Sequence, residues 1–407
     1  INERIRSMTG LKKRGALFVL LLALALIAAA CSSSDDTTTT AAAAETTTTA
    51  AAAETTTTAA AAETTTTAAA AETTTTAAAG FTGTPVLTCL VTDLAGVDDQ
   101  SFNQSAWEGV QQAMEQGFAH AESKFLESDA AEDWQSNIDT FVNQGCEHIV
   151  TVGFFLGGVT ETNAAANPDI NFTMIDNVLA ERYDNVRELV YQTDEAAFAA
   201  GYLAAGMSQS GIVGTYGGAN IPTVSIFLDG YARGVAHYND VKGADVQVIG
   251  WDVEAQDGLF TGSFTDMVLA RDTADSLFQE GVDMIIPVGG AINLPAGDAI
   301  IAAELDAALI GVDSDAFFAM DAKYQDLWLT TVEKKIKVLV AFSVQEHAEG
   351  TWTSGSFKGD LTNGGVGLAE FHSWDARVPA ELKAEVAQLL ADITDGTITW
   401  DKISVGA

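Results

Sequence analysis

The sequence predicts an α/β protein made of two doubly wound lobes, and three observations support this fold class. From about residue 82 onward, apolar runs typical of strands alternate with helical patterns. A second alternating series of similar length begins at Thr193-Asp194-Glu195. The 407 residues are also too many for one average domain and suggest two or three.

The predicted elements of the first series follow from these patterns. A strand is expected at 86–93, and the helix after it places apolar residues at helical spacing (Trp107, Val110, Met114, Phe118). The next helix carries apolar residues on one face (Trp134, Ile138, Phe141, Val142). Strands at 148–154, 171–176 and 186–191 follow, with a short helix that ends at Asn167-Pro168.

The second series opens with an alanine-rich helix at 196–207. Strands at 211–216, 246–251, 282–288 and 308–313 accompany helices at 221–238 and 264–279. A strand and a helix over 327–349 precede a glycine-rich stretch and a final helix at 380–390. These last units indicate that the chain crosses between the lobes more than once. We expect residues 82–192 and 316–350 in the N-terminal lobe, and 193–315 and 351–407 in the C-terminal lobe.

Residues 1–30 predict a secretory signal peptide. Basic residues at 12–14 precede an unbroken apolar run at 15–30, which is shorter than the ~20 residues of a membrane span. The sequence around Cys31 resembles a bacterial lipobox, in which the cysteine becomes the lipidated first residue. The alternative is an ordinary signal with an incidental cysteine.

Residues 31–81 are predicted to form a tether. Over 37–79, four threonines, four alanines and a glutamate repeat every nine residues, with no aromatic or large aliphatic side chain. Such a segment cannot bury a core. We expect it to hold the globular part away from a lipid anchor.

Charge and motifs exclude several classes of function. A formal net charge of −37 leaves no basic face for a nucleic acid or an anionic membrane. Five scattered histidines and no ligand spacing predict no metal site, and the Gly-Thr-Tyr-Gly-Gly stretch at 214–218 fits no dinucleotide or P-loop pattern. We therefore expect no cofactor. The sequence contains no nucleophile elbow and no histidine near a candidate nucleophile, so it gives no reason to assign a catalytic role.

The remaining cysteines are Cys89, in the first predicted strand, and Cys146, just before the predicted strand at 148–154. An exported protein can form a disulfide between them. Because sequence cannot show the required geometry, we expect two buried free thiols.

The loop after the first strand is the first candidate binding site, since open α/β folds bind ligands at the carboxyl ends of their strands. Asp93, Asp98, Asp99 and Asn103 can hydrogen-bond, and Phe102 offers a flat apolar face, a combination typical of a small-molecule pocket. For Asp98, Asp99 and Ser101, the alternative is helix capping. Capping leaves the aromatic residue unexplained.

Two further acids, Asp176 and Asp313, each end a buried strand, one in each series. Acids in this position are often helix caps, but equivalent positions in two lobes favour ligand contacts. Lys334 follows the strand that begins at 327 and lies beside the expected cleft. Its neighbours Lys335 and Lys337 leave a simple surface role open.

Several segments resemble the basic membrane protein (Bmp) family of lipoproteins, which includes purine nucleoside receptor lipoproteins. They are 92–109 with its Asp-Asp-x-Ser-Phe-Asn motif, 151–154, 196–201, 214–218 and 310–315. The resemblance runs from residue 86 to about 371. It implies a type I periplasmic binding protein fold with a hinge, and delivery of the ligand to an ABC importer. The family's Gly-Gly-Thr-Gly-like loop reads Gly-Gly-Ala-Ile-Asn at 289–293 here, and a Phe-Glu-x-Gly-Phe-like segment reads Phe-Leu-Asp-Gly-Tyr at 227–231.

The resemblance also implies roles for individual residues. Asp93 and Asp176 correspond to acids that contact a base, and Phe102 to one of two aromatics that sandwich it. The pair that holds ribose hydroxyls corresponds to Asp313 and Lys334. Phe264 matches the second aromatic best, with Phe260 and Trp251 as alternatives.

Together these observations predict a lipid-anchored solute-binding protein on the extracytoplasmic face of the cell membrane. We expect a monomer that binds a nucleoside, with a purine favoured, closes its lobes around it by a hinge motion and presents it to an ABC permease. The alternatives are a sugar or signalling ligand, a receptor or adhesin without transport, and a hydrolase using the Asp-rich loop as a metal site. The signal segment and the low-complexity stretch exclude a transcription repressor of the same fold.

Overall fold

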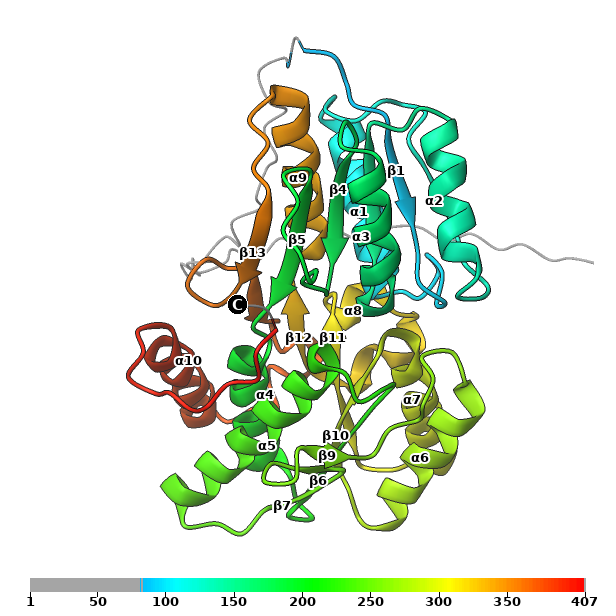
Figure 1. Ribbon diagram of the computed structural model, residues 1–407. Coiled ribbons are helices and arrows are strands. Elements are labelled where there is room, and N and C mark those ends of the chain that lie inside the picture. The colour runs from blue at the N-terminus through cyan, green and yellow to red at the C-terminus, as the bar shows by residue number, and fades with distance from the viewer. Residues whose placement is uncertain (1–80, 82, 406–407) are drawn as a thin grey trace, which may run out of the picture. The chain divides into compact units, whose positions relative to one another are not determined.

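Two six-stranded sheets, each the centre of one lobe, organise the residues that the computed structural model describes, which are 81 and 83–405 (Figure 1). This confirms the predicted two-lobed α/β fold. The predicted signal peptide, Cys31 and the tether up to residue 80 lie outside the described residues. Phe81 packs on Phe118, with ring centroids 5.0 Å apart, so it belongs to the folded part.

The first lobe has the strand order β13-β5-β4-β3-β1-β2, with every neighbouring pair parallel. Its strands are β1 (Thr88–Val91), β2 (Lys124–Leu126), β3 (His148–Val152), β4 (Asn171–Ile175), β5 (Val186–Tyr191) and β13 (Gly355–Gly359). Its helices are α1 (Phe102–Glu115), α2 (Asp133–Asn143), the 3-10 helix η1 (Phe154–Leu156), α3 (Gly157–Ala166) and α9 (Ile336–Glu349).

The second lobe has the order β14-β12-β11-β10-β6-β7, in which only β14 is antiparallel to its neighbour among the described strands of this sheet. Its strands are β6 (Ile212–Gly217), β7 (Gln247–Ile249), β10 (Met284–Val288), β11 (Ala308–Asp313), β12 (Trp328–Lys334) and β14 (Val366–Leu368), beside the small pair β8 (Trp251–Asp252) and β9 (Asp257–Gly258). Its helices are α4 (Asp194–Met207), α5 (Pro222–Lys242), α6 (Met267–Gln279), η2 (Gly290–Asn293), α7 (Leu294–Ala303), α8 (Ala316–Ala319), η3 (Ala322–Leu327), η4 (His372–Trp374) and α10 (Ala380–Thr394).

The chain passes between the lobes three times, after β5, after β12 and after β13. The expected domain boundaries are wrong for two segments. We placed 316–350 in the N-terminal lobe, but α8 and β12 belong to the second lobe because β12 pairs with β11. We placed everything after 350 in the C-terminal lobe, but β13 pairs with β5 of the first. Its sequence, Gly-Ser-Phe-Lys-Gly, has little apolar character and hides an edge strand.

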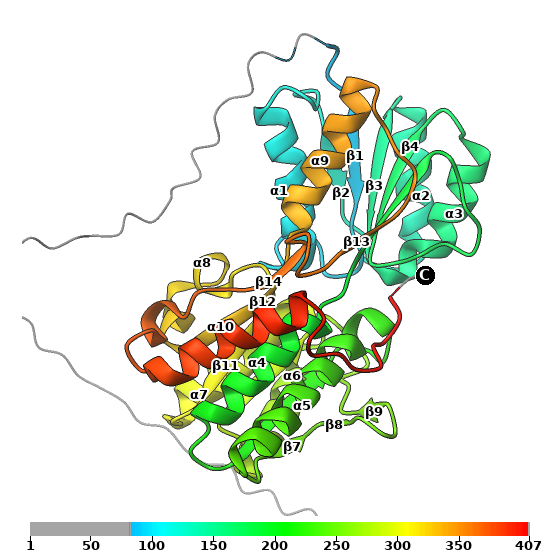
Figure 2. The same ribbon diagram turned by 90° about the vertical axis from the view of Figure 1, so that its left-hand side faces the viewer.

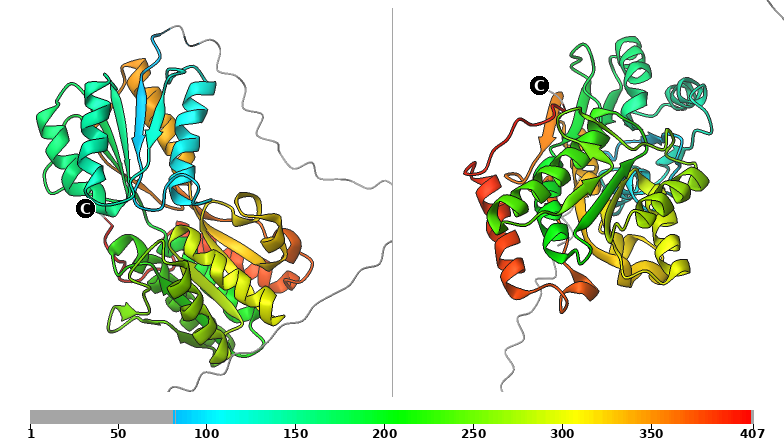
Figure 3. Two further views of the ribbon diagram at one scale, coloured as in Figure 1. Left: turned by 90° about the vertical axis from the view of Figure 1, so that its right-hand side faces the viewer. Right: turned by 90° about the horizontal axis from the view of Figure 1, so that it is seen from below.

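Close packing of α1 on α9 holds the segment after the second crossing to the first lobe, and Figure 2 shows the two helices side by side. At Gly109 of α1, a Cβ would lie 2.6 Å from the carbonyl oxygen of Lys337, so only glycine permits this approach. In the second lobe, α4 and α5 meet in the same way, since a Cβ at Gly201 or Gly234 would strike the backbone of the facing helix. Helix α10 lies along α4 on the outside of this pair (Figures 2 and 3).

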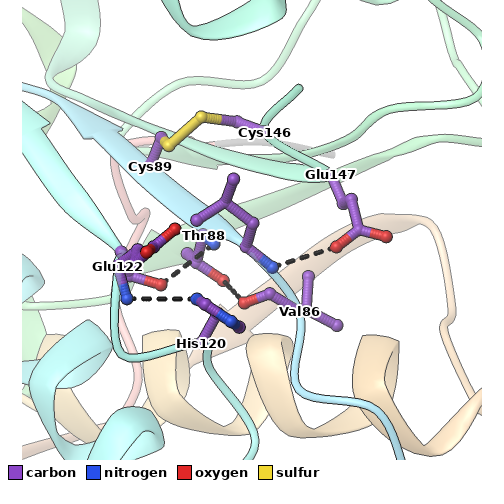
Figure 4. Close-up of a disulfide and its surroundings, with 9 residues drawn as sticks. Val86, Thr88, Cys89, His120, Glu122, Cys146 and Glu147 are labelled. Atoms are coloured by element: carbon purple, nitrogen blue, oxygen red, sulfur yellow. Dashed lines mark hydrogen bonds between the residues drawn. A yellow bond between two sulfur atoms is a disulfide. The ribbon is translucent and has the colours of Figure 1, made fainter. Parts of the chain in front are cut away.

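A disulfide joins Cys89 and Cys146, so the expectation of two free thiols is wrong (Figure 4). The cause is the pairing of β1 with β3, in which Cys89 lies beside Ile149. Cys146 lies two residues before the start of β3. Its Cα lies 6.0 Å from that of Cys89, within the range for a disulfide. The disulfide is buried in the core of the first lobe.

Among the described residues, no helix is long and apolar enough to cross a membrane.

Candidate functional site

A cavity between the lobes is lined by all six residues proposed from the sequence as ligand-binding. The first lobe contributes residues after β1, β3 and β4 and the start of α1, and the second lobe contributes residues after β6, at and after the end of β10, and at the ends of β11 and β12. These are carboxyl ends of parallel strands, where the fold class binds ligands. The lining residues are Asp93, Ala95, Asp99, Phe102, Asn103, Gly153, Phe154, Phe155, Asp176, Ile221, Thr223, Val224, Phe227, Phe264, Val288, Gly289, Gly290, Asp313 and Lys334.

At the centre of the cavity, Lys334 lies between two carboxylates. Its Nζ is 2.5 Å from Oδ2 of Asp176, in the other lobe, and 3.5 Å from Oδ1 of Asp313. Both acids have a left-handed backbone, with φ of 65° at Asp176 and 69° at Asp313. Such a conformation is uncommon outside glycine, although aspartate adopts it more readily than most residues, and here it occurs at the ends of two corresponding strands, β4 and β11.

The second carboxylate oxygen of Asp176 is buried and has no hydrogen-bond partner among the described residues. A buried acceptor without a donor is costly, so this oxygen favours a ligand that brings an N–H or O–H group. Burial raises the pKa of Asp176 to about 6, although the Lys334 ammonium acts in the opposite direction. Burial alone would lower the pKa of Lys334, but the carboxylates of Asp176 and Asp313 outweigh it and raise that pKa.

The loop after β1 has its own hydrogen-bond network. Oδ1 of Asp93 accepts from the amide of Asn103 at 2.8 Å and from the backbone N–H of Ala95 at 3.0 Å. These bonds fix the side chain and leave its other oxygen beside Gly153 at the cavity wall. Burial raises the pKa of Asp93 to about 6, against the lowering effect of the two hydrogen bonds.

Asp99 both caps α1 and lines the cavity, so the two interpretations of this residue coexist. Its carboxylate accepts from the backbone N–H groups of Ser101, Asn103 and Gln104 at 2.8–3.1 Å. Ser101 occupies the N-cap position, but its side chain makes no capping bond. Asp98 is exposed and is absent from the cavity wall.

Aromatic rings reach the cavity from both lobes. Phe102, at the start of α1, has Lys334 Nζ 5.1 Å from its ring centre, and Phe227 of α5 lies at a similar 5.2 Å. Phe264 lies in the loop before α6, and its ring packs where Cβ atoms of Gly218 and Gly289 would otherwise stand, at 2.3 Å and 2.8 Å. The glycines after β6 and β10 therefore make room for this ring.

The two alternatives for the second aromatic lie elsewhere. Trp251 donates its indole N–H to Asp229 at 3.2 Å, inside the second lobe, and Phe260 packs beside it. Neither lines the cavity. The two residues therefore form part of the lobe's own packing.

Sequence reasoning left Phe154, Phe155 and Phe227 out of the candidate set, although all three line the cavity. Phe155 is 50% exposed. A usable signal existed for Phe154 and Phe155, because they directly follow Gly153 at the end of β3. Phe227 gave none, since it lies at core spacing inside α5.

A metal site finds no support among the described residues, where no group of three or more histidine, cysteine, aspartate or glutamate side chains could hold an ion. In the Asp-rich loop, the oxygens of Asp99 already accept hydrogen bonds from N–H groups.

Comparisons with known proteins identify the family of the chain. The family model of Bmp, ABC transporter substrate-binding protein PnrA-like, matches residues 86–393. The ABC transporter nucleoside-binding protein BmpA of Lactococcus lactis subsp. cremoris is 28% identical over 333 residues, covering 78% of this chain and 89% of that protein. Basic membrane protein A of Borreliella burgdorferi is 26% identical over 309 residues, covering 74% and 84%.

Solved structures show the same fold. An ABC transporter solute-binding protein from Aeropyrum pernix K1 superposes with a TM-score of 0.69 at 24% identity, covering 78% of this chain and 94% of that one. An ABC transporter solute-binding protein from Conexibacter woesei gives a TM-score of 0.59 at 18% identity, covering 78% and 99%.

Proposed function

We propose that the cavity of this chain, which belongs to the Bmp family of PnrA-like ABC transporter substrate-binding proteins, binds a nucleoside, with a purine favoured. In this proposal the base lies between Phe102 and Phe264, and its N–H groups donate to Asp93 and Asp176. The ribose hydroxyls bind Asp313 and Lys334. The observation that carries the proposal is the buried, unpartnered oxygen of Asp176 in a cavity with aromatic rings from both lobes.

The charge of the cavity favours a nucleoside over a nucleotide. Four carboxylates line it, from Asp93, Asp99, Asp176 and Asp313, against the single ammonium of Lys334. A phosphate would meet an excess of negative charge inside a partly closed site, which is unfavourable. Neutral hydroxyl and amino groups are suited to these acceptors.

The proposal extends to cellular context. The apolar run before Cys31 supports export and lipid anchoring, and the family supports delivery of ligand to an ABC permease on the extracytoplasmic face. We expect a binding protein without catalysis, since the named relatives are binding and membrane proteins.

Calorimetric titration of the purified protein tests the ligand. We expect binding of adenosine, guanosine or inosine, no comparable binding of ribose, and weaker binding of the matching 5′-monophosphate. Phe102→Ala should weaken nucleoside binding by about 5- to 150-fold, the effect of losing 1–3 kcal/mol of base stacking. Binding of ribose alone, or of none of these compounds, would refute the nucleoside assignment and leave the fold unaffected.

A further inference from the structure

Two serines of α1 reach across from the first lobe to the second. Ser101 and Ser105 are one turn apart and lie on the same side of the helix. Both are buried, with Ser101 at 0% and Ser105 at 5% exposure. Neither lines the cavity. Their contacts therefore concern how the lobes meet.

The Ser101 hydroxyl is free for this contact because Asp99, and not Ser101, caps the N-terminus of α1. A serine at an N-cap position normally accepts from the backbone N–H groups of the first turn. Here the Asp99 carboxylate takes the N–H groups of Ser101, Asn103 and Gln104. The Ser101 hydroxyl makes no capping bond and is directed away from its own helix.

The target of Ser101 is the end of β11 in the second lobe. Its Oγ lies 3.2 Å from the carbonyl oxygen of Val312 and 3.2 Å from Oδ2 of Asp313. One turn further along α1, the Ser105 hydroxyl bonds the hydroxyl of Ser314. The two serines of the first lobe thus contact three consecutive residues of the second lobe, 312–314.

Asp313 is consequently held from both lobes. Lys334 of its own lobe approaches one carboxylate oxygen at 3.5 Å, and Ser101 of the other lobe approaches the second at 3.2 Å. The Ser101 contact exists only while the lobes are together, because Ser101 belongs to the first lobe and its partners Val312 and Asp313 belong to the second.

We propose that Ser101 and Ser105 form a latch that stabilises the closed lobes, and that Ser101 is a positioning residue for Asp313. Closure brings the Ser101 hydroxyl to the carboxylate, and this turns Asp313 toward the sugar hydroxyls. The positioning part rests on the proposed function, whereas the latch itself needs no ligand. Asp313 therefore distinguishes a ribose from a sugar that lacks these hydroxyls fully only when the lobes are closed.

Distance measurement on the ligand-free protein tests the latch. Spin labels at Ser136→Cys of α2 and Ser276→Cys of α6, both exposed, report the separation of the lobes in a Cys31→Ser background. Ser101→Ala/Ser105→Ala should move the distance distribution toward longer values. Ser105→Ala alone, which leaves Asp313 untouched, should do so partially and serves if the double variant is poorly folded.

A matched control is Ser225→Ala. Ser225 is 6% exposed and donates to the carbonyl of Ile221 at 3.1 Å within the second lobe. Its variant should keep the distribution of the parent protein. Unchanged distributions in both latch variants would overturn the latch, whether or not a nucleoside binds.

Affinity ratios test the positioning role. Ser101→Ala should lower the preference for inosine over 2′,3′-dideoxyinosine by about tenfold, the usual worth of one hydrogen bond to a charged group. A purely structural role would weaken both ligands equally and leave the ratio unchanged, which would overturn the positioning role. If the parent protein binds neither nucleoside, the proposed function and the positioning role fail together, while the distance measurement still decides the latch.

Discussion

Lys334 and Asp176 form an ion pair across the two lobes, with 2.5 Å between Nζ and Oδ2. Lys334 ends β12 of the second sheet, and Asp176 follows β4 of the first. Their side chains are only 4% and 7% exposed. Because the pair lies in the cavity, the contact that joins the lobes also belongs to the candidate binding site.

Replacing Lys334 by methionine should destabilise the protein strongly. The change leaves the buried carboxylates of Asp176 and Asp313 without their cation, and breaking a buried pair in this way costs about 3–5 kcal/mol. Urea unfolding measures the loss.

The control for this variant is Lys323→Met. Lys323 pairs with Asp298 at 3.0 Å, but both side chains are about half exposed (51% and 48%). An exposed pair contributes less than about 1 kcal/mol. Equal losses in the two variants would show that burial of the Lys334 pair has no energetic consequence.

Nucleoside affinity should fall as the pH is lowered through about 6. Burial raises the pKa of Asp93 and of Asp176 to about 6 in the free protein. Below that pH each carboxyl gains a proton and can no longer accept freely from an N–H of the base. Ligand binding to the ionised form must then displace a proton, so affinity drops up to about tenfold per pH unit for each group.

Titrations at pH 5, 6, 7 and 8 measure this dependence. Asp93→Asn should bind more weakly at pH 7 and show a shallower pH profile. A flat profile in the parent protein between pH 5 and 7 would mean that neither carboxylate accepts from the ligand.

Phe264→Ala should weaken nucleoside binding by about 5- to 150-fold, because one face of the base loses its stacking partner. Phe260→Ala is the matched control from the same segment, since Phe260 packs against Trp251 and does not line the cavity. We expect it to lower stability while affinity is retained. If Phe260→Ala weakened nucleoside binding more than Phe264→Ala did, Phe260 would be the second aromatic.

Gly218→Ala should reduce affinity without touching the ligand. The new Cβ would lie 2.3 Å from the ring of Phe264 and displace it from the cavity wall. Gly158→Ala in α3 is the control, because its Cβ meets open space and should stabilise the protein by about 0.4–1 kcal/mol. Calorimetric titration with thermal unfolding separates the two effects, and full affinity in Gly218→Ala would contradict the role assigned to Phe264.

Removing the disulfide with Cys89→Ala/Cys146→Ala should lower the free energy of unfolding by about 4 kcal/mol. The two residues are 57 apart in sequence, and closing a loop of that length restricts the unfolded chain by this amount in the chain-entropy model. Denaturant unfolding of oxidised parent protein and variant gives the difference. Nucleoside affinity should be retained, because the bridge lies in the core of the first lobe.

Most strands were predictable because their signal is local. Residues 186–191 and 308–313 match β5 and β11 to the residue, since both are short segments rich in strand-forming residues with clear boundaries. The short strands β2, β13 and β14 and the helix α7, with its internal proline and glycine, were missed because they lack that signal.

The candidate site was predictable in part for a different reason. Asp176 and Asp313 stand at strand ends, where the fold class determines which edge faces a ligand. Their common left-handed backbone and their shared contact with Lys334 were not visible, because they depend on pairing between distant strands. Phe227 was missed for another reason, because core spacing inside α5 does not distinguish a residue that faces a cavity from one that packs in the core.

The two-series α/β architecture, the acidic character and the candidate loop from Asp93 to Asn103 could all be read from the amino-acid sequence, because they depend on composition and local periodicity. The disulfide, the lobe of β12 and of β13, and the presence of Phe264 rather than Trp251 in the cavity wall are visible in the folded structure alone. Each of these depends on a contact between segments far apart in the chain. A strand's partner and a side chain's facing surface are set by the packing of the whole lobe, which no local pattern records.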